Sequence, residues 1–270
     1  MGTIQIDELR TLESPILLTN TLSVGRVSDG LVKYMLKDNK DIGVDTSSVN
    51  TVVCECNDGY LNIIQNLFFT EENVFKSIEK AENLFEEGNV GAGTGMVCYG
   101  LKSGIGSSSR IINIGNNDYT VGVLVLTNFG RMEDLTLKGV NIGYEIKEKI
   151  KSGYNREDKG SIITILATDI PLSYRQLNRV IKRVTNGIAR TGSFTGHGSG
   201  EIIVGFSTAN VINHDEKESF TNIKTIREDL LNYVFRATVE VTEEAILSSL
   251  IKSTTTTGRY NNIIYSINEF

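Results

Sequence analysis

Apolar and polar positions in the first third of the chain predict an alternation of strands and helices. The run over 15–22 (PILLTNTL) predicts a short buried strand, and residues 23–38 follow with apolar side chains at helical spacing. Residues 51–56 (TVVCEC) begin with β-branched side chains and predict a second strand. Thr70 is suited to cap a helix over 71–87, whose apolar stripe we expect to face the core.

The middle of the chain predicts a sheet with side chains packed on both faces. Residues 110–128 indicate a hairpin whose turn lies at Asn116 and Asn117. Its second arm is apolar at successive positions from Tyr119 to Leu126, as in a strand that is covered on both sides.

Later segments predict two more strands and two long helices. Residues 161–168 (SIITILAT) and 201–207 (EIIVGFS) have the character of buried strands. We expect one helix to open at Pro171 and run to about Arg190, and a longer one to span roughly 222–251. The charged stretch 144–159 predicts an exposed loop that starts as a helix end.

This order of elements favours two sheets stacked face to face with helices outside them. A doubly wound parallel sheet would require a stricter alternation of strands and helices than the sequence contains. Neither an internal repeat nor a linker interrupts the pattern, so we predict a single domain over 1–270.

Composition and charge narrow the class of protein. Hydrophobic residues make up 40% and charged residues 22%, which is typical of soluble globular proteins. No apolar run reaches the ~18 residues of a membrane helix, and the N-terminus lacks the apolar core of a secretory signal. Three cysteines in a chain of this length favour a reducing compartment, and we predict a cytoplasmic protein. A net charge of −6 argues against a nucleic-acid partner.

The sequence is poor in the residues of metal sites and histidine-based catalysis. Cys54 and Cys56 have one residue between them and no histidine at ligand spacing, so we expect both to be buried on one face of a strand rather than to bind zinc. The two histidines, His197 and His214, do not suit a Ser-His-Asp arrangement. The glycine-rich stretch 88–106 has Leu101 where a phosphate loop requires lysine, and it predicts close backbone approaches instead.

The junction Lys159-Gly160-Ser161 is the feature most suited to chemistry. The predicted charged loop ends in glycine, and a serine then begins a predicted buried strand. The serine hydroxyl could attack the preceding carbonyl, shift the acyl group from nitrogen to oxygen and so break the chain. The α-amine that this frees has a reference pKa of about 7.7–8.0 and could act as base for its own hydroxyl. Taken alone, the dipeptide is also compatible with an ordinary boundary between loop and strand.

Several stretches together closely resemble the DmpA-like family of D-aminopeptidases and β-peptidyl aminopeptidases, over nearly the whole chain. They are PILLTNTLSVGRV (15–27), DGYLN (58–62), GAGTGMVCYGLKSGIGSSSR (91–110), YTVGVLVLTNFG (119–130), GSIITILATDIPL (160–172) and GHGSGEIIVGFSTAN (196–210). The resemblance implies a four-layer αββα sandwich, similar to that of N-terminal-nucleophile hydrolases but with different connectivity. It also implies cleavage between Gly160 and Ser161 into an α chain (1–160) and a β chain (161–270).

The same resemblance implies a role for individual residues. Ser161 would be the N-terminal nucleophile, and Ser199 and Glu201 would tune its proton transfers. Asn128 would donate to the tetrahedral oxyanion, and Glu55 would receive the free amine of a short peptide or amino-acid amide. The resemblance implies no metal or organic cofactor, no membrane or nucleic-acid partner, and a homo-oligomer, a tetramer of α/β pairs.

Two departures from the family pattern bear on activity. Many relatives carry a tyrosine two residues after the matched glutamate, whereas this chain has Asn57 there and Tyr60 as the nearest phenol, so we expect both residues to contact substrate. Relatives usually have a further segment before the stretch that matches GTIQIDEL. Two alternatives stay open at this point: an acyltransferase of the ornithine acetyltransferase type, which uses a threonine nucleophile, and a non-catalytic truncated homologue.

Overall fold

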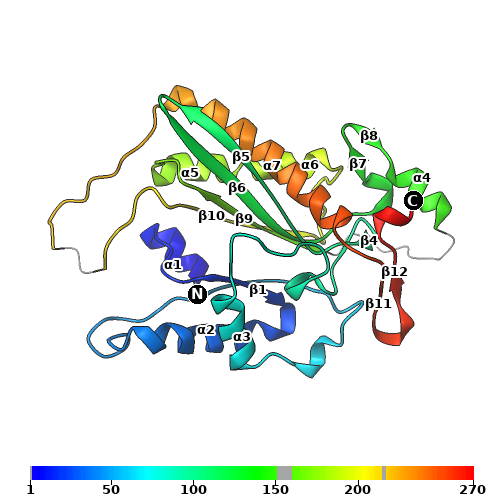
Figure 1. The fold of residues 1–270 in the computed structure, drawn as a ribbon, viewed down its shortest axis with the longest axis horizontal. Coiled ribbons are helices and arrows are strands. Elements are labelled where there is room, and N and C mark those ends of the chain that lie inside the picture. Colours follow the sequence, from blue (N-terminus) through cyan, green and yellow to red (C-terminus); the bar gives the residue numbers. More distant parts are fainter. Residues whose placement is uncertain (1, 151–159, 215–216) are drawn as a thin grey trace.

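The computed structural model describes residues 2–150, 160–214 and 217–270 and arranges them in four layers (Figure 1). Helices α2 (Val24–Asp38) and α3 (Glu71–Glu79) cover a two-stranded parallel sheet of β1 (Ile16–Asn20) and β2 (Val52–Cys56). This sheet packs on a four-stranded sheet, whose far face is covered by further helices. The predicted αββα sandwich is therefore confirmed.

The four-stranded sheet contains the elements that position the site. Its strand order is β10 (Gly200–Ser207), β9 (Ser161–Thr168), β6 (Asn117–Asn128) and β5 (Ile105–Ile114). Strands β10 and β9 run parallel, and the other two pairs are antiparallel. Its outer face packs against α5 (Tyr174–Ile181), α6 (Val184–Arg190) and α7 (Leu231–Ile251).

Smaller elements complete the structure. The remaining helices are α1 (Gly2–Leu9) and α4 (Gly143–Lys149), and short strands form the pairs β3 (Val97–Cys98) with β4 (Leu101–Lys102), β7 (Thr136–Leu137) with β8 (Val140–Asn141), and β11 (Thr256–Thr257) with β12 (Ile263–Ile264).

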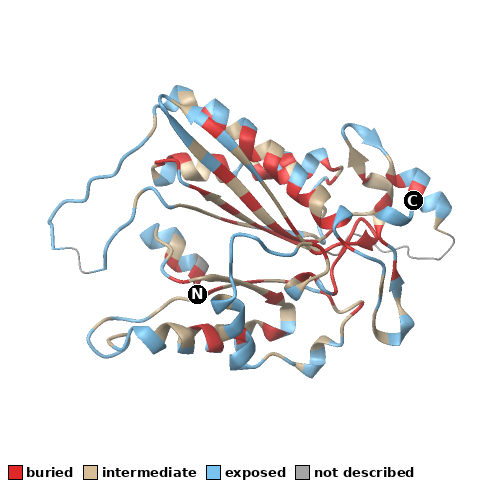
Figure 2. Ribbon diagram, in the orientation of Figure 1, coloured by how far each residue is buried: buried red, intermediate tan, exposed pale blue. Residues whose placement is uncertain are grey.

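Strand β6 packs side chains on both faces over its second half, from Val121 onward, as its sequence predicts (Figure 2). Val121, Val123 and Val125 pack into the cluster shared with α7, whereas Leu126 packs into the cluster between the two sheets. Cys54 and Cys56 both face that inter-sheet cluster, which confirms their predicted burial on one side of β2.

The charged stretch after β8 begins as a helix. Helix α4 has exposed charged residues and one buried side chain, that of Ile146. The rest of the predicted loop, 151–159, lies outside the described residues.

Three helix predictions have wrong boundaries. The helix capped by Thr70 ends at Glu79, because the chain then leads to Gly88, which pairs with Ile105 of β5. The helix expected over 171–190 starts at Tyr174, where Ser173 forms a capping box with Gln176. It breaks after Ile181 into α5, which packs against β10, and α6, which packs against α7.

The longest helix also begins later than predicted, at Leu231 rather than near 222. The preceding backbone is held by tertiary hydrogen bonds: the N–H of Ile226 donates to the Pro171 carbonyl, and the Asn210 side chain both donates to and accepts from the Lys224 backbone. Tertiary contacts therefore override the helical spacing in this segment. The hairpin turn differs by one residue, since Ile114 pairs with Asn117 and the turn is formed by residues 115 and 116.

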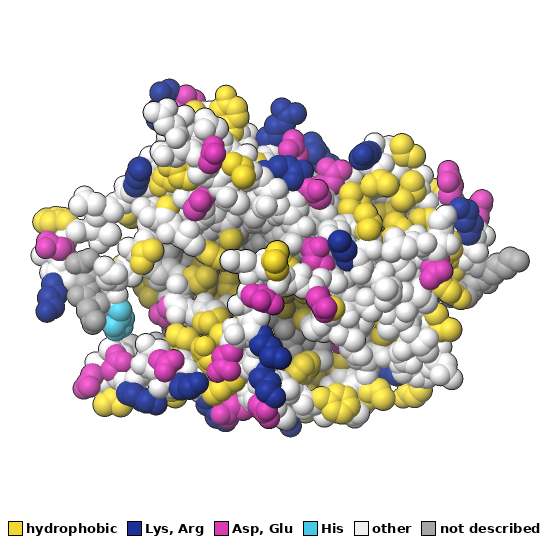
Figure 3. All heavy atoms as spheres, viewed as in Figure 1, with side chains coloured by type: hydrophobic (Ala, Val, Ile, Leu, Met, Phe, Trp, Pro, Cys, Tyr) yellow, Lys and Arg dark blue, Asp and Glu magenta, His cyan; other side chains and the backbone are white. Residues whose placement is uncertain are grey.

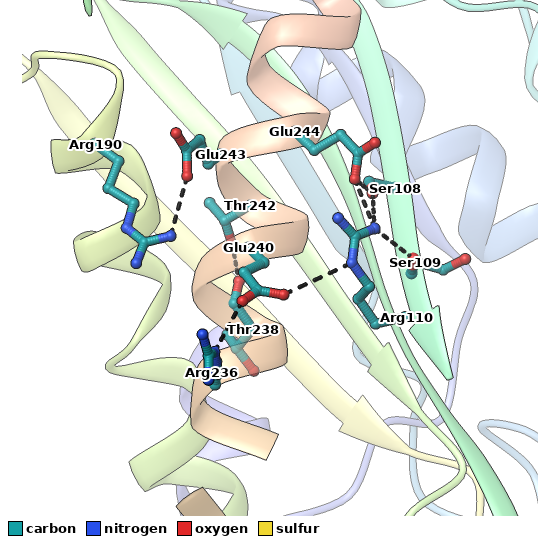
Figure 4. Close-up of polar contacts among 10 residues, drawn as sticks. All are labelled: Ser108, Ser109, Arg110, Arg190, Arg236, Thr238, Glu240, Thr242, Glu243 and Glu244. Carbon is teal, nitrogen blue, oxygen red and sulfur yellow. Dashed lines mark hydrogen bonds and ion pairs between the residues drawn. The ribbon is translucent and has the colours of Figure 1, made fainter. Parts of the chain in front are cut away.

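Charged side chains join α7 to its neighbours on the outer surface (Figure 4). Arg110 of β5 lies 2.6 Å from Glu244 and 3.8 Å from Glu240, and Arg190 of α6 lies 3.1 Å from Glu243. Because these pairs are partly exposed, each is worth at most ~1 kcal/mol. Figure 3 shows Lys and Arg interspersed with Asp and Glu over the face that it displays.

Gly106 allows α7 to lie close against β5. A Cβ at this position would be 2.0 Å from the Ala245 carbonyl oxygen, so Gly106→Ala must push the helix outward. We expect it to lower the free energy of unfolding by about 1–3 kcal/mol. Gly122, on the neighbouring strand β6, is the matched control, because a Cβ there meets its nearest atom at 3.9 Å. Urea unfolding should place Gly122→Ala within about 1 kcal/mol of wild type; equal losses for the two variants would contradict the close packing.

Candidate active site

Three strand ends meet at one edge of the four-stranded sheet. Strand β6 ends at Asn128, β9 begins at Ser161 and β10 begins at Gly200. Ser161 is the register partner of Asn128 on one side and of Gly200 on the other. Residues paired in this way present their side chains to the same face of a sheet, so Asn128 and Ser161 face the second sheet together.

The partner of the Ser161 side chain across the inter-sheet space is Cys56. The Cys56 thiol hydrogen-bonds with the Ser161 hydroxyl and lies 3.7 Å from the Leu126 carbonyl oxygen, to which it donates. Burial raises the pKa of Cys56 to about 12, and the hydrogen bond with Ser161 acts in the opposite direction. Cys56 is therefore a neutral thiol beside the serine. The alternation of β2 predicted its burial but not this contact.

Gly160 fits a space that no larger residue could occupy. A Cβ on it would lie 1.7 Å from the Asn128 carbonyl oxygen. Its own carbonyl oxygen accepts the main-chain N–H of Gly200 at 3.1 Å. The peptide carbonyl that precedes Ser161 is thus fixed and polarised by a backbone donor of β10, which the sequence did not reveal.

The amide of Asn128 is held in one orientation. Its Oδ1 accepts the Val97 N–H at 3.1 Å, and its Nδ2 donates to the Asn57 carbonyl oxygen at 3.0 Å. Because the Val97 N–H can only donate and the Asn57 carbonyl can only accept, the two ends of the amide cannot be exchanged. The amide nitrogen carries a second hydrogen that is available in principle to an acceptor in the site.

Ser199 and Glu201 lie together, as their spacing predicts. The Ser199 hydroxyl donates to Glu201 Oε1 at 2.9 Å, and the two residues flank Gly200 in the sequence. Glu201 alternates with Gly200 along β10, so its side chain leaves the strand on the face that points away from the inter-sheet space, while Ser199 precedes the strand. The pair is thus one strand away from the main chain of Ser161.

Glu55 lies near the end of β2, on the face of that sheet that points away from Ser161. It precedes Cys56 in β2 and points to the opposite face of that sheet, where its carboxylate accepts the Thr21 hydroxyl. Thr21 begins the short helical turn (Thr21–Ser23) that follows β1. The carboxylate is half-buried and fixed at the ends of the two parallel strands.

Asn57 contacts Asn128 through its backbone carbonyl, and Tyr60 is held by packing. Asn57 Oδ1 accepts the Gly59 N–H at 3.0 Å, which turns the side chain into its own loop, while its carbonyl accepts from Asn128. Tyr60 is half-buried and packs against the cluster that contains Val97. The structure thus joins Asn57 to Asn128 through the main chain of Asn57, whereas Tyr60 is placed by its packing.

A buried lysine next to the site was missed by the sequence analysis. Lys102 is 0% exposed, and its Nζ donates to the carbonyls of Met96 at 2.9 Å, Gly93 at 3.1 Å and Ser103. Burial lowers the pKa of Lys102 to about 7, and the charge of Asp58 acts in the opposite direction. Asp58 is itself 4% exposed, and burial raises its pKa. The signal in the sequence was a single lysine inside a glycine-rich segment with close backbone approaches.

A cavity of about 260 Å³ adjoins Asp58. Its walls combine polar groups with a larger apolar set, and they consist of Asn20, Ser23, Asp58, Asn62, Ile63, Ile64, Leu67, Phe68, Phe69, Gly91, Ala92 and Thr94. Within residues 2–150, 160–214 and 217–270, no three His, Cys, Asp or Glu side chains gather as metal ligands would. None of the helices described there has the length and apolarity to cross a membrane.

Comparison with known proteins agrees with this geometry. The sequence model of peptidase family S58 matches residues 1–264. Beta-peptidyl aminopeptidase BapA of Sphingosinicella microcystinivorans is 36% identical over 95% of this chain and 67% of its own length. The enzyme of the same name from Sphingosinicella xenopeptidilytica is 37% identical over 97% of this chain and 68% of its own length.

Solved structures show the same fold. A Pyrococcus horikoshii protein superposes with a TM-score of 0.92 at 50% identity, covering 98% of this chain and 73% of its own. The L-aminopeptidase D-Ala-esterase/amidase of Ochrobactrum anthropi, described as a prototype of the serine aminopeptidases and a new variant of the Ntn hydrolase fold, gives 0.83 at 33% identity, with coverage of 93% and 69%. The acyltransferase alternative is not favoured by these matches. The chain belongs to peptidase family S58 and is a serine aminopeptidase of the N-terminal-nucleophile type.

Proposed function

We propose that the chain cleaves itself between Gly160 and Ser161, and that the new N-terminal serine then releases N-terminal residues from short peptides, amides or esters. The observation that carries this proposal is the fixed Gly160 carbonyl, which accepts the Gly200 N–H immediately before a serine hydroxyl at the start of a buried strand. A donor in this position stabilises the negative charge that develops when the carbonyl is attacked.

Self-cleavage proceeds in two steps. Ser161 Oγ attacks the Gly160 carbonyl carbon, the C–N bond breaks, and the proton of Oγ moves to the nitrogen, which gives an ester and a free α-amine. Water then hydrolyses the ester, which leaves a carboxylate on Gly160 and restores the serine hydroxyl. The products are an α chain over 1–160 and a β chain over 161–270, which stay associated through the pairing of β6 with β9.

Turnover uses the liberated amine as the base. It takes the proton of Ser161 Oγ as the oxygen attacks the substrate carbonyl, and it returns that proton to the leaving amine. Asn128 donates its second Nδ2 hydrogen to the oxyanion, and the Gly200 N–H, released by Gly160, can serve as a second donor. The hydrogen-bonded pair of Ser199 and Glu201 orients the amine and stabilises its protonated form. Water then cleaves the acyl-enzyme.

Substrate binding is proposed to rest on two features. The fixed carboxylate of Glu55 would pair with the free amine of the substrate, with Asn57 and Tyr60 forming the adjoining wall. The cavity beside Asp58 would take the side chain of the first residue, since its walls are mainly apolar. Relatives named for β-peptidyl and L-amino-acid substrates make both classes the first to test.

We also infer a cytoplasmic homo-oligomer. All three cysteines are free and buried, which suits a reducing compartment. Exposed apolar side chains, among them Val211, Ile212 and Phe220, support association with further copies.

Cleavage has a direct test by intact mass. Wild type should give two fragments that meet at 160/161, and Ser161→Ala should give one full-length chain, because it lacks the attacking oxygen. Three other Gly-Ser pairs occur, at 106–107, 192–193 and 198–199, and they should stay whole. Ser107→Ala is the matched control and should be cleaved like wild type. A wild-type chain that remains whole and hydrolyses aminoacyl amides would rule out this mechanism.

Removal of the proposed oxyanion donor should affect turnover more than maturation. We expect Asn128→Ala to lower kcat by ~10²–10³. Self-cleavage should persist in this variant, because the Gly160 carbonyl is held by Gly200 rather than by Asn128 Nδ2. Asn262→Ala, which removes another side-chain amide bound to a loop carbonyl, is the control and should keep its kcat. Unchanged kcat in Asn128→Ala would exclude the role.

Thiol reagents should distinguish Ser161 from Cys56 as the nucleophile. With the Cys56 pKa raised to about 12, ~10⁻⁴ of the thiol is ionised at pH 8. Iodoacetamide at this pH should therefore leave the folded enzyme active and unmodified, while in concentrated urea all three cysteines should be alkylated. Rapid inactivation of the native enzyme, with alkylation at Cys56, would point to a cysteine nucleophile instead.

A further inference from the structure

Lys102 reaches the site through one peptide unit. Its Nζ donates to the Met96 carbonyl oxygen at 2.9 Å. The same peptide unit presents the Val97 N–H on its other side, and this N–H donates to Asn128 Oδ1 at 3.1 Å. A continuous series of hydrogen bonds thus runs from Lys102 Nζ, through the Met96–Val97 peptide, to the amide that faces Ser161.

We propose that Lys102 is a positioning residue that orients and polarises Asn128 through the Met96–Val97 peptide. This inference rests on the proposed role of Asn128 as oxyanion donor. Hydrogen bonds in series strengthen one another, because a donor at a carbonyl makes the N–H of the same peptide more acidic. A firmly held Oδ1 in turn makes the Asn128 Nδ2 hydrogens stronger donors and fixes the direction in which they point.

Lys102 is in an unusual environment for a residue with a packing role alone. A buried ammonium is costly to desolvate, and an apolar side chain of similar length would fill the same space at lower cost. Its three carbonyl acceptors equal the number of hydrogens on an ammonium group, so the segment 93–103 is folded around it. Asp58, 4% exposed, supplies the opposing charge.

The Met96 carbonyl has a second donor, which limits the expected effect. The main-chain N–H of Ser103 lies 3.3 Å from the same oxygen. Loss of Lys102 should therefore weaken the orientation of the peptide without freeing it. For that reason we expect a smaller effect than that of removing Asn128 itself.

A double-mutant cycle on the processed enzyme tests the proposal. Lys102→Met should lower kcat roughly 10-fold, with KM within about 2-fold of wild type, on whichever of the β-alanine, D-alanine and L-alanine p-nitroanilides the wild type hydrolyses. Combined with Asn128→Ala, it should cause no further loss, since residues that act through one group are not additive. Lys102→Gln, which keeps an N–H donor, should recover part of the kcat.

The controls separate this proposal from the proposed function. Ser103→Ala removes a buried hydrogen bond, to the Thr127 carbonyl at 3.0 Å, from the residue next to Lys102, and it should keep its kcat. Intact mass should show normal cleavage in every Lys102 variant, and rates are normalised to the cleaved fraction. If Lys102→Met yields no folded protein, the cycle with Lys102→Gln must show the same lack of additivity.

Each contrary outcome has one meaning. An uncleaved wild type would refute the proposed function, whereas an Asn128→Ala variant with full kcat would refute the role of Asn128 as oxyanion donor and, with it, the role of Lys102. A normal loss in Asn128→Ala, together with full kcat in Lys102→Met, would refute only the role of Lys102. Losses that multiply in the double variant would do the same, because they would show that Lys102 acts independently of Asn128.

Discussion

The lateral register of β6, β9 and β10 is the constraint on which the site depends. It sets Ser161 between Asn128 and Gly200, and it brings the Gly160 carbonyl within reach of the Gly200 N–H. A slip of one residue in either pairing would turn the Ser161 hydroxyl to the helix side of the sheet and separate it from Cys56. The buried side chains that alternate along β9 oppose such a slip, since Ile163 must face the second sheet while Ile162 and Leu166 face the helices.

The second sheet places a neutral thiol beside Ser161, the proposed nucleophile. Cys56 is small, buried and protonated near neutral pH, because burial raises its pKa to about 12. It can hydrogen-bond with the Ser161 hydroxyl without taking its proton, so the base for the reaction has to be a different group. The Ser161 α-amine that cleavage would free is the group that the mechanism assigns, and its ordinary pKa suits that task. The packing between the sheets therefore places a hydrogen-bonding group beside Ser161 that does not itself act as a base.

The local sequence predicted an element correctly where its hydrophobic pattern agrees with the tertiary packing around it. Strand β9 occurs over the residues expected, and the spacing of Ser199 and Glu201 is reflected in their hydrogen bond. Predictions failed where tertiary hydrogen bonds replaced helical ones, as in the segment that Pro171 and Asn210 hold ahead of α7. The contacts of Cys56 and Lys102 could not be predicted, because each joins segments that are distant in sequence. The roles proposed for Asn128 and Glu55 came from family resemblance. Asn128 shares the inter-sheet space with Ser161, whereas Glu55 points to the opposite face of its own sheet.

Backbone groups form much of this site, and this accounts for its composition. The Gly200 N–H binds the Gly160 carbonyl, the Val97 N–H and the Asn57 carbonyl bind the Asn128 amide, and the Met96 carbonyl accepts Lys102 Nζ. Strand pairing, and glycines that permit close approach, position these backbone groups. A backbone N–H or C=O is available whatever side chain its own residue carries. The link of Asn57 to Asn128, for example, runs through the Asn57 carbonyl and not through its side chain. A site made of backbone groups requires loops that are held in one conformation. Lys102 contributes to this, because its buried Nζ donates to three carbonyls of the segment 93–103.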